Sequence, residues 1–233
     1  MVQAISKKPL NALSLERVIQ KAGNAVPIAY VFEAPIHYIV LTRKDNTFNG
    51  DFIKEYMAVL DEIEATEGPG ILVTIGTGEK HFSTGFDLDY WCKSFEDHMT
   101  SVKLFYDLMA KLLEFPMPTM CIFNGNAFAG GYLLGLCYDT RIMNEAVGDI
   151  CLTELKLGIA LPLPMMLVCK AKLGPNVCLR LVKAIVVPPS EALKDGMIDA
   201  TYSSVGDLEK QMAAYCKRYA PLGASRLAMK MNK

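Results

Sequence analysis

Apolar residues along the chain fall into two patterns, short continuous runs and longer stretches in which they recur every three or four positions. The runs at 28–32, 36–42 and 71–75 have the length and the β-branched content of buried strands. Between the last two runs, residues 49–67 carry apolar side chains at helical spacing, and a Gly-Pro-Gly breaker follows at 68–70. A strand–helix–strand order of this kind predicts a parallel strand pair joined by a right-handed crossover.

The second half of the chain continues the alternation. A helix is expected over 101–115, where it meets the prolines at 116 and 118, and a strand is expected over 119–123. The later elements are expected in this order: strands at 140–143 and 150–152, helices at 163–173, 175–185 and 190–195, a strand at 198–202, and helices at 206–219 and 223–231. Alternating strands and helices that end in a run of helices predict an α/β protein with a helical C-terminal region.

The length and composition favour a single domain preceded by a short extension. With 52% hydrophobic residues, a chain of 233 residues can bury one large core, and no Ser/Gly-rich or Pro-rich linker divides it. The domain is expected over 28–233. Residues 1–27 form the extension, in which 11–20 can fold as a basic amphipathic helix. Two interpretations of residues 1–27 stay open, a targeting segment and a plain N-terminal extension.

Charge, cysteine and histidine content argue against several classes of protein. A formal net charge of −1 argues against a general nucleic-acid binder, and no apolar stretch reaches the length of a membrane span. The seven cysteines lack C-x-x-C spacing and have apolar neighbours, which fits reduced, buried thiols in an intracellular protein. The three histidines show no H-E-x-x-H pattern, so no metal site is expected.

The stretch 124–134, NGNAFAGGYLL, lies between the strand at 119–123 and an apolar run at 132–138 that is long enough to begin a buried helix. Small residues at a strand-to-helix passage leave unpaired backbone N–H groups at the helix N-terminus, where the helix dipole favours negative charge. Glycine at 130 and 131 removes the side chains that would keep a ligand away from the backbone. Taken alone, such a glycine pair is more often a tight packing turn.

A second stretch of the same kind, HFSTGFDL at 81–88, follows the strand at 71–75. It also passes from a strand end through small residues into a helix start. Two such termini can aim two backbone N–H groups at one oxygen atom, which is what an oxyanion hole requires. The pair of stretches therefore indicates a site that stabilises a developing oxyanion.

These two stretches, together with TELKLGI at 153–159, resemble the crotonase (enoyl-CoA hydratase/isomerase) superfamily, and within it the plant-type monofunctional Δ3,Δ2-enoyl-CoA isomerases. The resemblance runs from around Ile28 to the C-terminus. It implies a crotonase-type spiral of ββα turns to about residue 160, followed by a helical region that assembles homotrimers.

The resemblance also implies an isomerase reaction in the β-oxidation of unsaturated fatty acids. The main-chain N–H groups of Phe86 and Gly130 would bind the thioester oxygen of a 3-enoyl-CoA, and Glu154 would carry a proton from C2 to C4. Coenzyme A is then part of the substrate, and no metal or other cofactor is required. The implied compartment is the peroxisome or the mitochondrion. The positions that would contact substrate and coenzyme A are Ser83, Gly85, Leu88, Gly131 and Leu133.

Glu154 is also the candidate that the residues themselves favour as proton carrier. It lies in the mostly apolar stretch 150–159, so its carboxyl group is expected in apolar surroundings. Such burial raises the pKa of a carboxyl toward working pH, where it can both take and return a proton. On composition alone, a surface glutamate or a salt bridge to Lys156 is about as good an interpretation.

Leu133 distinguishes the isomerase from its nearest alternative. Hydratase members of the superfamily carry a second glutamate at the matching position, and a leucine cannot activate water. Two rival functions stay open, a hydratase that uses another acid and a non-catalytic acyl-CoA-binding homologue. Three further polar residues are interpreted as structural or peripheral: Asp87 as a helix cap, Asp139 as a structural acid, and His81 as a loop residue near the entrance.

Overall fold

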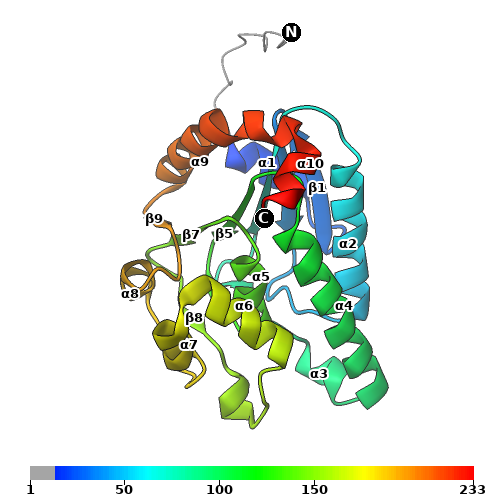
Figure 1. Cartoon of the computed structure of the whole chain (residues 1–233), viewed down its shortest axis with the longest axis vertical. Coiled ribbons are helices and arrows are strands. Elements are labelled where there is room, and N and C mark those ends of the chain that lie inside the picture. Colours follow the sequence, from blue (N-terminus) through cyan, green and yellow to red (C-terminus); the bar gives the residue numbers. More distant parts are fainter. Residues whose placement is uncertain (1–13) are drawn as a thin grey trace.

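The largest element of the structure is a six-stranded sheet (Figure 1). The structure is a computed structural model that describes residues 14–233. β1 (Ile28–Glu33) pairs antiparallel with β2 (Ile36–Leu41), and every other pair of neighbours in this sheet is parallel. The other strands follow in the spatial order β3 (Ile71–Gly76), β5 (Thr119–Phe123), β7 (Thr140–Asn144) and β9 (Ala200–Tyr202). The parallel pair expected from the strands at 36–42 and 71–75 is confirmed as β2 and β3.

A second, three-stranded parallel sheet contains β4 (His81–Ser83), β6 (Asn126–Phe128) and β8 (Ile150–Cys151). Each of its strands follows one strand of the large sheet along the chain: β3 leads to β4, β5 to β6 and β7 to β8. The chain therefore winds through both sheets in turn before each helical segment. This winding is the ββα spiral that the resemblance implies.

Two hydrophobic cores cover the two faces of the large sheet. One core packs α2 (Gly50–Glu64), α4 (Phe95–Leu113) and α5 (Gly130–Leu136) against the sheet. The other core lies beneath α1 (Leu15–Ala22) and α9 (Val205–Tyr219). Because both faces of the sheet are covered, β2 and β3 are buried along their whole length and show no alternation of apolar and polar residues.

Most of the remaining helices lie in the lower half of the view in Figure 1, and the rest lie at the C-terminal end of the chain. They are α3 (Leu88–Trp91), α6 (Leu163–Leu173), α7 (Pro175–Leu181), α8 (Pro189–Lys194), α10 (Arg226–Met231) and the 3-10 helices η1 (Glu154–Leu157) and η2 (Ala220–Ala224). Within residues 14–233, no helix combines the length and the apolar character that crossing a membrane requires.

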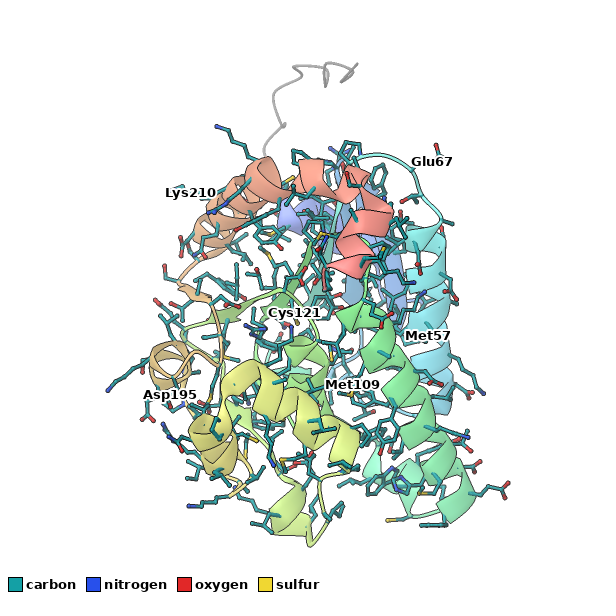
Figure 2. The ribbon with its side chains drawn as sticks, in the orientation of Figure 1. Met57, Glu67, Met109, Cys121, Asp195 and Lys210 are labelled. Atoms are coloured by element: carbon teal, nitrogen blue, oxygen red, sulfur yellow. The ribbon has the colours of Figure 1, made fainter. Side chains whose placement is uncertain are left out.

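Side chains fill the space between the ribbons on the α2–α4 face of the sheet (Figure 2). Met109 of α4 and Cys121 of β5 are buried there, whereas Glu67 and Lys210 lie at the periphery. This partition follows the helical spacing of apolar residues seen in the sequence.

Several boundaries and placements differ from the sequence-based expectations. α4 begins at Phe95 rather than 101, because Ser94 caps it by accepting a hydrogen bond from the Asp97 N–H. His81 lies in strand β4, so its interpretation as a loop residue is wrong. All seven cysteines are free and six are buried, but Cys92 is exposed. Residues 1–13 of the N-terminal extension lie outside the described range. A helix was expected at 11–20, and in the described part of the chain it begins at Leu15 and extends to Ala22 as α1.

Candidate active site

The segment 82–87 holds the first of the two expected N–H donors. It runs beside Phe48: the Phe48 N–H donates to the Gly85 carbonyl at 2.8 Å, and the Asp87 N–H donates to the Phe48 carbonyl at 2.9 Å. Because a strand directs successive N–H groups to opposite sides, these two bonds turn the Phe86 N–H away from Phe48. Among residues 14–233 the Phe86 N–H has no hydrogen-bond acceptor.

The N-terminus of α5 holds the second donor. Ala129 precedes the helix with φ of 46°, and its carbonyl accepts the N–H groups of Tyr132 and Leu133. Gly130 and Gly131 are the first two helical residues, so their N–H groups have no partner inside the helix. In the described part of the chain they have no acceptor elsewhere either.

The two donor segments pack directly on each other through their glycines. A Cβ atom on Gly85 would lie 2.7 Å from the main-chain nitrogen of Gly130, which no real side chain tolerates. Gly85 also has φ of 86°, a conformation that glycine adopts without strain. The contact brings Phe86, the next residue after Gly85, to the start of α5. The sequence-predicted residues Phe86 and Gly130 therefore come together, although their stretches are far apart in the chain.

Glu154 is the first residue of η1 and follows β8, the last strand of the small sheet, after two residues. β8 pairs with β6, with Cys151 opposite Phe128, and the Ala129 N–H donates to the Cys151 carbonyl at 2.8 Å. The chain that leads to Glu154 thus runs alongside the chain that leads to Gly130. After Glu154, its own carbonyl accepts the Ile159 N–H at 3.0 Å, which closes the turn.

The Glu154 carboxyl is largely withdrawn from water, as expected, although its neighbours Leu155 and Leu157 are themselves more than half exposed. Its Oε2 atom is buried and has no hydrogen-bond partner among residues 14–233, and the ion pairs of this range do not include one with Lys156. Burial raises the pKa of this carboxyl above its usual range. The surface and salt-bridge interpretations are therefore wrong.

Helix α6 carries a thiol that is close enough to this carboxyl to interact with it electrostatically. Burial, the neighbouring Cys178 thiol and the Glu154 carboxylate together raise the pKa of the Cys169 thiol to about 12. The side chains of Cys169 and Met165 are buried in the same core as Leu133 of α5. The order of elements along the chain does not by itself predict this proximity of Cys169 to Glu154.

The sequence-predicted substrate contacts fall into three groups. Gly85 and Gly131 lie at the glycine contact, where the backbone is bare. Leu133 is fully buried in α5, and Leu88 is 44% exposed at the start of α3. The Ser83 hydroxyl is occupied by protein, because it donates to the Asn46 carbonyl and accepts the Gly85 N–H. Ser83 therefore acts on the shape of the backbone rather than offering a hydroxyl to a ligand.

Two acids have the structural roles expected of them. Asp87 caps α3 by accepting the Tyr90 N–H at 3.0 Å. Asp139 accepts the Thr119 N–H at 2.8 Å and pairs with Lys233 at 2.7 Å. Both carboxylates are satisfied by protein groups, whereas the Oε2 atom of Glu154 has no hydrogen-bond partner among the described residues.

Comparison with known proteins identifies the family. The family model described as "Enoyl-CoA hydratase/isomerase" matches residues 32–233. The chain belongs to the enoyl-CoA hydratase/isomerase family. Two curated relatives in this family are "Enoyl-CoA delta isomerase 3" and "Enoyl-CoA delta isomerase 2, peroxisomal", both from Arabidopsis thaliana and each 30% identical to this chain. The first alignment covers 83% of this chain and 82% of the relative, and the second covers 69% and 70%.

Solved structures of the enoyl-CoA hydratase/isomerase family share the fold. An enoyl-CoA hydratase from Bacillus halodurans has a TM-score of 0.80 at 18% identity, covering 89% of this chain and 86% of that one. An enoyl-CoA hydratase from Shewanella pealeana has a TM-score of 0.76 at 24% identity, covering 94% and 84%. At these identities the likeness establishes the crotonase fold and leaves the choice of reaction to the site.

Asn46 contacts the segment 82–87, and the sequence did not indicate it as a residue of the site. Asn46 lies in the turn between β2 and α2 and is fully buried, with its side chain bonded to the Phe82 carbonyl. Its only signal in the sequence is an Asp-Asn pair before the start of a helix, which is typical of many turns.

Proposed function

We propose that the protein is a Δ3,Δ2-enoyl-CoA isomerase that acts on unsaturated acyl-CoA thioesters in β-oxidation. The observation that carries the proposal is the Glu154 carboxyl, whose Oε2 atom is buried and has no hydrogen-bond partner, beside two segments whose main-chain N–H groups have no acceptor in the described range. The names of the Arabidopsis relatives support the isomerase over other reactions of the family.

The reaction begins when the thioester oxygen of a 3-enoyl-CoA accepts hydrogen bonds from the N–H groups of Phe86 and Gly130. The Glu154 carboxylate then removes a proton from C2, and the electron pair of that C–H bond moves toward the carbonyl to form an enolate. The two N–H groups stabilise the negative oxygen, and loss of one such donor typically lowers kcat about 100- to 1,000-fold.

The second half of the reaction returns the same proton. Glu154, now a neutral acid, donates it to C4 while the enolate carbonyl reforms and the double bond moves to the C2–C3 position. General acid–base transfer of this kind contributes about 100- to 10,000-fold. The raised pKa of the Glu154 carboxyl suits both steps, because it makes the carboxylate a stronger base and keeps the protonated form accessible.

Hydration is disfavoured because the site lacks a second carboxylate. Leu133 occupies the position that carries a glutamate in hydratases, and it is fully buried among apolar side chains. A leucine side chain offers no oxygen that could orient or activate a water molecule. The proposed enzyme therefore moves a proton within its substrate rather than adding water.

The proposed assembly is a homotrimer held by the C-terminal helices. Leucines of η1, α6 and α7 are more than half exposed, and such a concentration of exposed apolar residues is typical of a subunit interface. They are Leu155, Leu157, Leu163, Leu167 and Leu179. Light scattering on the purified protein measures the subunit number. For the compartment, β-oxidation leaves the peroxisome or the mitochondrion, and two Arabidopsis relatives are named peroxisomal.

The function is tested with purified protein and 3-hexenoyl-CoA, following the absorbance of the conjugated product. Wild-type protein should turn over, and Glu154→Gln should lose at least about 1,000-fold in kcat, because the amide cannot take the C2 proton. Glu145→Gln, which changes an exposed glutamate after β7, serves as the matched control and should leave kcat unchanged. A folded wild-type protein without turnover contradicts the proposal, and water addition to 2-hexenoyl-CoA would favour the hydratase.

A further inference from the structure

We propose that Asn46 is a positioning residue that fixes the segment 82–87 so that the Phe86 N–H is held free for the substrate. The inference rests on the proposed function, because it assigns a role in presenting one of the two oxyanion donors. The contacts that fix the segment come from the turn 45–48, which joins β2 to α2.

Polar contacts connect this turn to almost every residue of the donor segment. The Asn46 side-chain amide donates to the Phe82 carbonyl at 2.8 Å, and the Ser83 hydroxyl donates to the Asn46 carbonyl at 2.8 Å. The Thr84 N–H donates to the Asp45 carbonyl at 3.0 Å.

Phe48 completes the connection by bonding to Gly85 and Asp87 on either side of Phe86. Within the stretch 82–87, Phe86 alone has no hydrogen bond to the turn 45–48. The pattern fixes its neighbours and leaves its N–H group unoccupied. A donor held in this way needs no reorganisation when charge develops on the thioester oxygen.

Asn46 is suited to this turn by its backbone as well as its side chain. Its φ is 43°, a left-handed conformation that asparagine tolerates better than most residues. Its side-chain Oδ1 accepts the Arg43 N–H at 2.9 Å, while its Nδ2 reaches Phe82. The side chain thus braces the turn internally and links it to the donor segment, and it is fully buried between them.

Simple stabilisation of the fold would also explain a buried, bonded asparagine, so the test must separate the two roles. Asn46→Gly keeps the left-handed backbone accessible and removes the amide that reaches Phe82. Asn46→Asp has nearly the same shape and keeps the acceptor for the Arg43 N–H, but it places an oxygen where the donor to the Phe82 carbonyl was.

Tyr56→Phe is the matched control for loss of a buried polar group. The Tyr56 hydroxyl lies 2.9 Å from the Thr74 hydroxyl and 2.6 Å from the Tyr138 hydroxyl, all fully buried. Its removal should lower the melting temperature without touching the segment 82–87. Three quantities are compared across the variants: kcat and KM with 3-hexenoyl-CoA, the melting temperature, and amide hydrogen exchange of a peptide that spans 82–87.

Both Asn46 variants should lower kcat by at least about 10-fold with KM changed less than about 3-fold, because a misplaced donor is felt mostly in the transition state. Amide exchange over 82–87 should accelerate in both, while Tyr56→Phe keeps wild-type kcat and wild-type exchange there. Unchanged kcat in either Asn46 variant, or an equal loss in Tyr56→Phe, overturns the inference. If the wild-type protein does not turn over, the proposed function fails, and unchanged exchange over 82–87 would then overturn the positioning role separately.

Discussion

Gly131 of α5 and Ser83 of β4 leave no room between them for a side chain. A Cβ atom on Gly131 would lie 2.5 Å from the Ser83 carbonyl oxygen and 2.7 Å from the Ser83 Cβ. This contact and the one between Gly85 and Gly130 join the two halves of the proposed oxyanion site. The spacing of β4 from α5 is therefore set by the absence of two side chains.

Gly131→Ala should separate these elements and impair catalysis. The added methyl group meets backbone rather than a flexible side-chain end, so either β4 or α5 must move, at about 1–3 kcal/mol of stability. We expect kcat with 3-hexenoyl-CoA to fall at least about 10-fold, because small displacements of donors are felt strongly in the transition state. Urea denaturation and steady-state kinetics measure the two effects.

Gly206→Ala is the control for this substitution. Gly206 lies in the first turn of α9, and a Cβ atom there would meet nothing within 4 Å. Alanine favours the helix by up to about 1 kcal/mol, so this variant should be as stable as wild type or more stable, with unchanged kcat. Wild-type kcat in Gly131→Ala would show that the contact does not set the donor geometry.

The raised pKa of the Glu154 carboxyl predicts the acid limb of the pH–rate profile. The carboxylate must be ionised to remove the C2 proton, so kcat/KM should fall as pH drops through the pKa of Glu154. That midpoint should lie above the usual glutamate value of 4.5 because burial disfavours the charged form. A profile flat down to pH 4.5 would contradict the burial of the reacting base.

Burial of the same carboxyl should lower the stability of the folded protein at neutral pH, where the carboxyl is ionised. A folded-state pKa raised above the unfolded value gives stability that is fully present below the unfolded pKa and is lost as pH rises through the folded pKa. At pH 7 the buried carboxylate therefore destabilises the fold, and Glu154→Gln should melt at a higher temperature than wild type. Near pH 4 the two melting temperatures should converge, whereas a constant difference across this window would contradict the assignment.

Helix α1 should contribute measurably to folding, although the family match begins only at residue 32. Leu15 and Val18 are buried in the core beneath α9, and the Leu15 N–H donates to Glu209 at 2.8 Å. Leu15→Ala should destabilise the protein by about 2–5 kcal/mol. Ile19→Ala, at a position 37% exposed, should have a much smaller effect in the same denaturation experiment. Equal effects would mean that α1 does not pack as a core element.

The large sheet and its long helices were predictable because their residues carry a strong periodic signal. β2 and β3 are continuous apolar runs, and α2 places Phe52, Tyr56 and Leu60 on one buried face. In the small sheet only β8 was expected, at 150–152; β4 and β6 gave no such signal, because they have three residues each and are stabilised by pairing with strands distant in sequence. Propensity cannot identify elements that short.

The candidate site was predictable only in part for a related reason. The apolar neighbours of Glu154 indicated a buried carboxyl, and the glycines indicated bare backbone at two helix starts. The contacts of Asn46 could not be predicted from the sequence. Asn46 bonds to a segment more than thirty residues away, and no sequence pattern indicates its left-handed φ. The thiol of Cys169 reaches the neighbourhood of Glu154 only because α6 folds back over α5.

Leu133 predicts how completely the enzyme excludes hydration. Its side chain is fully buried in α5 and packs in the core that also holds Met165 and Cys169. Wild-type protein should therefore show no measurable water addition to 2-hexenoyl-CoA under conditions where 3-hexenoyl-CoA is isomerised.

Two substitutions at Leu133 test this. Leu133→Met nearly conserves the side-chain volume, so it should lower the free energy of unfolding by less than about 1.5 kcal/mol and keep isomerase activity. Leu133→Glu places a charge in apolar surroundings, and we expect it to lower the melting temperature steeply rather than to create a hydratase. Appearance of hydratase activity in folded Leu133→Glu would show instead that the pocket admits water and that this one side chain decides the reaction.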